Sequence, residues 1–197
     1  LERFCENAWD RLESSHRIIL GIWDLGEQRE AVEFLRQMRG LKGFFAYGEE
    51  EIEAPLIELS ALFDKKASQK EFEKRMKGAE SYFQKYQYNW YYLERLTLAA
   101  IYLDRPEEAA KIFELSMNPK ENREQARQIF CDPRASKEIL RKLWRKFYQN
   151  LKYESEENHM DLAHCAYALG DKEALKFHLE SLEEICAGQS GYDKSWA

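Results

Sequence analysis

The stretch WYYLERLTLAAIYLDRPEEAAKIFELSMNP, residues 90–119, decides the fold that this sequence predicts. Its first half is an apolar segment with helical character, and Asp104 provides an exit from that helix. Glu107 and Glu108 then stand in the first turn of a second helix, where acids suit the positive end of the helix dipole. The small residue Ala109 is expected to face the preceding helix. The stretch therefore predicts a helical hairpin.

The same kind of turn occurs at two other places in the chain. Residues 25–31 read LGEQREA and residues 169–174 read LGDKEA, and each segment follows an apolar helix. Gly26 and Gly170 are suited to end these helices because glycine takes the left-handed backbone geometry cheaply. We therefore expect three hairpin turns of one kind.

A second kind of turn is shared by two further segments. The two segments are FDKKAS, residues 63–68, and FCDPRAS, residues 130–136. They share an aspartate, an alanine and a serine. Aligning these three residues gives one offset of 68 residues. That offset is twice the period of about 34 residues that is typical of helix-turn-helix repeats. Ser68 and Glu71 also predict a capping box at the start of a helix.

The five turns centre near residues 26, 64, 104, 132 and 170, which predicts helices in five pairs within a single domain, 1–197. Pro55 should either kink its helix or mark the first turn. The predicted helices are 2–24, 27–39, 49–63, 68–87, 90–103, 106–117, 120–131, 136–152, 155–169 and 172–187. The corresponding hairpins are 2–39, 49–87, 90–117, 120–152 and 155–187.

At these positions the sequence resembles the tetratricopeptide repeat (TPR) family. The resemblance is carried by the large and small packing residues Trp90, Leu93, Leu96, Ala99, Tyr102, Ala109, Phe113 and Pro119. It implies an all-α fold, a right-handed α-α superhelix or TPR-like solenoid of about five hairpins. It also implies a concave face, lined by the first helix of each pair, that binds an extended peptide or a partner's helix. The family is overwhelmingly non-catalytic.

The resemblance also implies which residues face a partner. On the helix at 90–103 the family's groove positions fall on Tyr91, Glu94, Leu98, Ile101 and Tyr102. On the helix at 155–169 they fall on Met160, His164 and Tyr167. Independently, the dense aromatic run at 82–92 makes Tyr88 and Tyr91 candidates for a binding surface, because exposed tyrosine offers a large contact area with few rotors to order.

Composition and charge narrow the class of partner. The chain has 44% hydrophobic and 34% charged residues, with a formal net charge of −6. That charge disfavours nucleic acid, since phosphate contacts require a basic field, and it favours a protein or peptide partner of basic character. No apolar run approaches the roughly 20 residues of a membrane span. We expect no membrane partner and, by default, a cytoplasmic location.

No pattern of catalytic, cofactor-binding or metal-binding residues stands out. The sequence has no glycine-rich phosphate loop, GxSxG elbow or HExxH motif, so we expect no enzyme activity, no cofactor and no metal. His159 and His164 are five residues apart, which does not align them on one helix face; with Cys165 and His178 they leave a zinc site as a minor alternative. The four cysteines, which lie in apolar patterns, are expected to be reduced core residues.

A basic amphipathic helix is predicted at 136–152. Its apolar residues recur at helical spacing and predict a core stripe, whereas its basic face is expected to be solvated or paired with nearby acids. The basic residues of this segment are Arg134, Lys137, Arg141, Lys142, Arg145, Lys146 and Lys152.

The function that these features favour is a non-catalytic scaffold or adaptor that binds a protein or peptide on a concave face. One alternative is an immunity protein or secretion chaperone that sequesters a single partner, which rests on analogy between small acidic helical proteins. Another is an enzyme that uses an unrecognised carboxylate or histidine site, with His164 as the first residue to test.

Overall fold

The structure is a computed structural model, and it describes residues 17–27, 29–31, 33, 34, 37, 57–77, 90–116, 122–151 and 155–190. Every regular element within these ranges is helical, in agreement with the predicted all-α class. The contacts divide the chain into two compact units, Leu1–Leu103 and Asp104–Ala197. Each unit is considered by itself, and the single domain and superhelix predicted from the sequence stay predictions.

The first unit contains helical residues 17–24 and 57–63 together with α4 (Lys65–Lys77) and α6 (Trp90–Tyr102). Ile19, Ala31 and Leu59 form a buried cluster in this unit. Trp23 packs against Phe63 next to this cluster, with ring centroids 4.6 Å apart. These contacts bury the apolar faces of short helices that have little stability in isolation.

The capping box predicted at Ser68 is wrong. Helix α4 begins at Lys65, so Ser68 lies inside it, and the Ser68 amide donates to the carbonyl of Asp64. The Ser68 side chain is buried, and its hydroxyl donates to the carbonyl of Ile57 at 2.9 Å. The serine thus ties α4 to the helical segment before it. Pro55 lies outside the described residues.

The second unit contains α7 (Pro106–Ser116), α8 (Asn122–Phe130), α9 (Lys137–Phe147), α10 (Glu156–Leu169) and α11 (Lys172–Ser190). A short 3-10 turn, η1 (Tyr148–Asn150), extends α9. These helices occupy the segments predicted at 106–117, 120–131, 136–152, 155–169 and 172–187. The turns predicted near residues 132 and 170 therefore lie where the sequence placed them.

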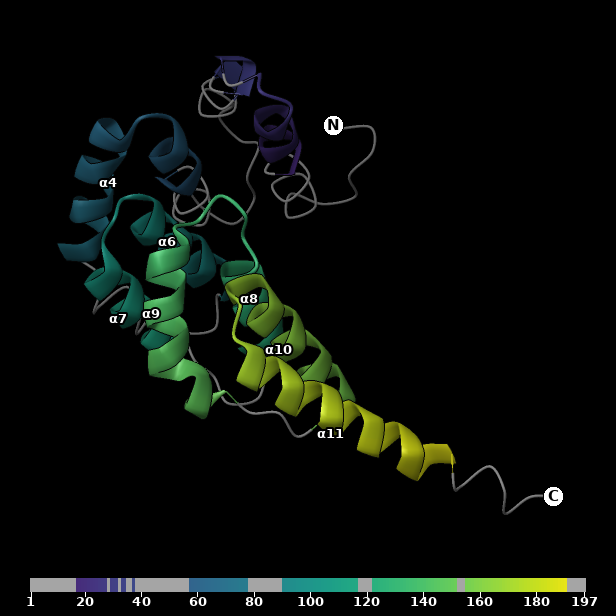
Figure 1. Cartoon of the computed structure of the whole chain (residues 1–197). Coiled ribbons are helices and arrows are strands. Elements are labelled where there is room, and N and C mark those ends of the chain that lie inside the picture. The colour runs from purple at the N-terminus through teal and green to yellow at the C-terminus, as the bar shows by residue number, and fades with distance from the viewer. Residues whose placement is uncertain are drawn as a thin grey trace. The chain divides into compact units, whose positions relative to one another are not determined.

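Helix α10 lies beside both α8 and α11, as the green and yellow ribbons of Figure 1 show. Two contacts join α8 to α10: Arg127 pairs with Asp161 at 3.2 Å, and the sulfur of Cys131, just after α8, lies 4.0 Å from that of Cys165. Both contacts join residues 34 positions apart. These two contacts between the α8 segment and α10 therefore share one sequence offset.

A chain of aromatic rings forms the core of the second unit. Phe113 of α7 contacts Phe130 and Phe147, with ring centroids 5.5 Å and 5.0 Å apart. Phe130 in turn meets Trp144, and Trp144 meets Tyr148. Tilted and edge-on ring pairs of this kind stabilise a core beyond the area that they bury. The chain fixes α9 between α7 and α8.

Candidate functional site

An exposed stripe along α10 is the surface that best matches the predicted binding residues. Met160, His164 and Tyr167 are spaced at i, i+4 and i+7, so they lie on one face of the helix. Met160 is 47% exposed, Tyr167 is 76% exposed, and His164 is also exposed. We call these three residues the α10 stripe. A tyrosine this open on a helix is a common feature of binding surfaces.

The opposite face of α10 packs into the second unit. Its buried residues are His159, Leu162, Ala163, Cys165, Ala166 and Leu169. Ser155 begins the helix, and its hydroxyl accepts a hydrogen bond from the amide of Asn158. Gly170 ends it in the left-handed conformation, with φ of 74°. The α10 stripe is therefore held on a helix that is capped at both ends and packed along its length.

The α6 residues predicted to line the groove do not form an exposed surface. Glu94, Leu98, Ile101 and Tyr102 are at most 5% exposed. The reason is that α6 is buried on every side from Tyr92 to Tyr102, so it has no free face over that length. A partner cannot contact these four side chains directly in this conformation. Glu94 instead pairs with the Arg95 guanidinium, which also binds Glu58.

The two remaining predicted residues are not placed by the structure. Tyr88 lies outside the described residues, and only the backbone of Tyr91 is described. Their proposed part in a binding surface stays a prediction.

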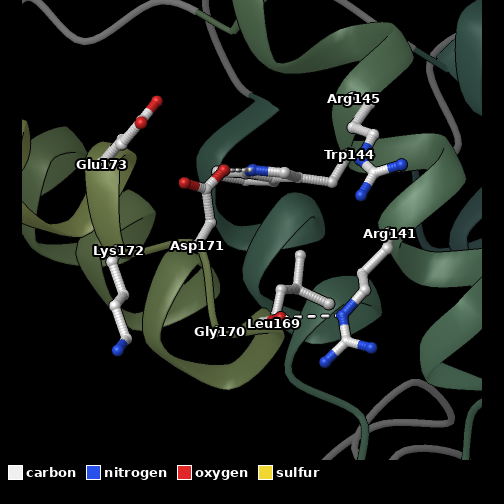
Figure 2. A pocket seen from close by; sticks show the side chains of 8 residues that line it. All are labelled: Arg141, Trp144, Arg145, Leu169, Gly170, Asp171, Lys172 and Glu173. Carbon is white, nitrogen blue, oxygen red and sulfur yellow. Dashed lines mark hydrogen bonds between the residues drawn. The ribbon is translucent and has the colours of Figure 1, made fainter.

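A pocket of about 410 Å³ opens where the turn between α10 and α11 meets α9. Figure 2 shows the Trp144 indole pointing at the Asp171 carboxylate, and Arg141 reaching the carbonyl of Leu169. The residues that line the pocket are Arg141, Trp144, Arg145, Leu169, Gly170, Asp171, Lys172 and Glu173.

Asp171 is the residue that organises this pocket. One carboxylate oxygen accepts from Trp144 Nε1 at 2.8 Å, and the other accepts from the amide of Ala174 at 3.1 Å. The second bond caps the start of α11, where a carboxylate is also favoured by the helix dipole. The Arg141 Nε donates to Leu169 at 2.9 Å, at the end of α10. These polar groups thus connect α9 to the α10–α11 turn.

A buried polar chain crosses the other end of the same hairpin. His159 Nδ1 and His178 Nδ1 are 3.0 Å apart, and the Tyr148 hydroxyl lies 3.1 Å from His178 Nε2. His178 is 0% exposed. Burial lowers the pKa of His178 to about 4, and the neighbouring His159 adds to that effect. The sequence groups both residues only as part of a possible zinc site, and it does not show that their rings meet, because they belong to different helices.

The zinc site considered from the sequence is not assembled. His164 is exposed on the α10 stripe, whereas His159 and Cys165 lie on the buried face of the same helix. Among the residues that the structure describes, no group of three or more His, Cys, Asp or Glu side chains could hold a metal ion.

The cysteines differ in their surroundings. Cys131, Cys165 and Cys186 are free thiols. Cys165 is buried and Cys131 partly buried, but Cys186 is exposed, so the expectation of a core position is wrong for Cys186. It lies near the end of α11. Cys5 lies outside the described residues.

The amphipathic character predicted for 136–152 is confirmed over α9. Ile139, Leu140, Leu143, Trp144 and Phe147 are its buried residues. On the outer face Lys142 pairs with Glu138 at 2.9 Å, and Lys146 pairs with Glu114 at 3.5 Å. Part of the basic face is therefore paired with acids, as the pattern predicts.

Comparison with family models, curated proteins and solved structures found no match. The TPR resemblance accordingly rests on the residue pattern alone. Within the described ranges, no helix has both the length and the apolar character that a membrane crossing requires.

Proposed function

We propose that this chain is a non-catalytic protein-binding module of TPR-like helical hairpins, and that its α10 stripe contacts the partner. The observation that carries the proposal is the exposure of Met160, His164 and Tyr167 together on one face of a well-fixed helix. The stripe presents the apolar side chain of Met160, the imidazole of His164 and the aromatic ring of Tyr167 in one row. Such a row can contact one face of a partner helix or of an extended peptide.

Helix α10 holds the α10 stripe in place in the absence of a partner. Helix α10 is packed between α8 and α11, and its caps hold both ends. A pre-ordered helix loses little conformational entropy when it binds, so a small number of exposed side chains can contribute most of the affinity. The 34-residue register between α8 and α10 supports the repeat character of the proposal.

The test compares two variants with the same number of changes. One replaces Met160, His164 and Tyr167 by alanine. The matched control replaces Lys176, Leu179 and Glu183, which are exposed on α11 at similar helical spacing. Wild type and both variants are immobilised, proteins are captured from the native lysate, and the bound proteins are identified and quantified.

We expect wild type and the control to retain the same partner, and the stripe variant to lose at least about tenfold in affinity, or about 1.4 kcal/mol. All three chains should unfold alike, because the replaced side chains are exposed. If the stripe variant retains every captured partner, the proposal fails. Stoichiometric capture of one single partner would instead favour the sequestering role, that of an immunity protein or secretion chaperone.

A further inference from the structure

Cys131 and Cys165 form a close pair of thiols between two hairpins of the second unit. Their sulfur atoms are 4.0 Å apart, and the Arg127–Asp161 ion pair lies one helical turn earlier on both sides. Cys131 directly follows α8, whereas Cys165 lies inside α10 on its buried face. The contact is therefore part of the interface between α8 and α10, and it involves neither the α10 stripe nor the pocket at Trp144.

The two thiols differ in access and in acidity. Cys131 is partly exposed, and Cys165 is 0% exposed. The hydrogen bond between the two thiols lowers the pKa of Cys131, and the Arg127 guanidinium adds to this effect. The same hydrogen bond, together with burial, raises the pKa of Cys165. Cys131 is thus the thiol that reagents reach and that ionises more readily, which are the properties of a reactive cysteine.

We propose that Cys131 and Cys165 are a redox pair that a hydroperoxide converts to a disulfide joining α8 to α10. The Cys131 thiolate attacks one peroxide oxygen, so that an S–O bond forms, the O–O bond breaks and an alcohol or water leaves. Cys131 is then a sulfenic acid. The Cys165 sulfur attacks the Cys131 sulfur, the S–O bond breaks, and the hydroxyl leaves as water with the Cys165 proton. The two thiols lose two electrons and the peroxide gains them.

The local backbone allows the required approach. A disulfide needs an S–S distance of about 2.05 Å. Cys165 is fixed in the middle of α10, but Cys131 stands in the turn before α9, which begins at Lys137. The Cys131 amide donates to the carbonyl of Arg127 in α8, so the approach requires rotation of the Cys131 side chain together with a small adjustment of the residues that follow it.

The disulfide would close a loop of 34 residues that contains all of α9. A cross-link of this length stabilises the folded state mainly by restricting the unfolded chain. It would hold the hairpins 120–152 and 155–187 in register. The α10 stripe stays exposed, because it lies on a different side of α10 from Cys165.

The experiment uses the full chain with Cys5→Ser and Cys186→Ser, alongside wild type. Reduced protein is treated with hydrogen peroxide, the remaining thiols are blocked, and the chain is digested without reductant for mass spectrometry. We expect a linked peptide containing Cys131 and Cys165 within one chain, lighter by two hydrogen atoms and cleaved by dithiothreitol. The oxidised chain should unfold several degrees higher than the reduced chain.

Two further variants test the assigned roles. With Cys165→Ser, peroxide should leave a sulfenic acid on Cys131 that dimedone traps. With Cys131→Ser, the buried Cys165 should resist oxidation in the folded chain. Persistent sulfenic or sulfinic acid on Cys131 in the presence of Cys165, or cross-links only between chains, would overturn the proposal. Disulfide formation no faster in the folded chain than in concentrated urea would also overturn it.

Discussion

Three residues that end helices share one unusual backbone conformation. Gly26, Asp104 and Gly170 have φ values of 86°, 58° and 74°. The sequence predicts helix exits at all three, from the shared pattern of an apolar helix, a Gly or Asp, and acids in the next first turn. Left-handed geometry is accessible to glycine and tolerated by aspartate, so local chemistry is sufficient to place these turns.

Replacing Gly170 by alanine should destabilise the second unit by about 1–2 kcal/mol. The cause is backbone strain, since the nearest atom to an added Cβ, Arg141 Nη2, is 3.8 Å away. Gly21→Ala is the control, because Gly21 is helical with open space around it, and it should stabilise by about 0.5–1 kcal/mol. Urea denaturation measures both, and effects of the same sign would contradict this account.

Arg95 takes part in a buried ion-pair network that the sequence pattern does not predict. Its neighbour Glu94 is predicted to face a partner, yet Arg95 binds both Glu94 and Glu58 within the first unit. Glu58 is 0% exposed, and a buried carboxylate is costly unless it is paired, so its contact with this guanidinium is stabilising. A buried network of this kind stabilises only while all its members are present.

Arg95→Met should therefore lower the free energy of unfolding by about 3–5 kcal/mol, because it removes a buried cation that pairs with two buried carboxylates. Lys142→Met removes the cation of an exposed pair with Glu138 and should cost less than about 1 kcal/mol. Both values come from urea denaturation at neutral pH. Equal losses in the two variants would show that the buried network does not behave as described.

At the scale of elements, the sequence predicts the positions of α10 and α6, but its predicted exposed face agrees with the structure only for α10. Both are predicted at the observed positions, with α10 at Glu156–Leu169 and α6 at Trp90–Tyr102. The exposed face of α10 agrees with the predicted Met160, His164 and Tyr167. The predicted residues of α6 do not form an exposed face, because every residue from Tyr92 to Tyr102 is buried. A helical period identifies a face but does not show whether a neighbour covers it.

The packing of α9, α10 and α11 creates a pH dependence at His178. The described polar groups that act on its ring include Tyr148 and His159, which lie within 3.1 Å of its nitrogens, and Asp171, whose charge raises its pKa. In the folded chain His178 stays neutral down to its pKa of about 4, whereas in the unfolded chain it takes a proton near 6.5. The unfolded state binds more protons between these values, so stability should fall by about 2–3 kcal/mol as the pH falls from 6.5 to 4.

Urea denaturation at a series of pH values measures this loss. His178→Phe should remove most of the slope over that range, and the exposed control His164→Gln should retain it. If His178→Phe keeps the slope of wild type, the loss of stability belongs to other groups.

At the scale of the whole molecule, the described contacts form two units with separate cores. The second unit carries the α10 stripe, the histidine pair and the thiol pair, each on a different part of the same set of helices. Binding and oxidation can therefore be tested separately, since variants of the stripe leave Cys131 and Cys165 in place. Within this unit, the Arg127–Asp161 and Cys131–Cys165 contacts between the α8 segment and α10 both join residues 34 positions apart.

The sequence by itself determined the helical class and, among the described residues, the approximate positions of the helices of the second unit and of the turns near 132 and 170. Helix exits and apolar spacing act between residues close in the chain, whereas the predicted cap at Ser68 is wrong. It also placed the buried stripe of α9 correctly. Only the tertiary structure decided that Glu94, Leu98, Ile101 and Tyr102 are buried, that His159 meets His178, and that Cys131 meets Cys165. These contacts depend on how helices rotate and stack. One residue of shift turns a helix face by about 100°, which local patterns do not specify.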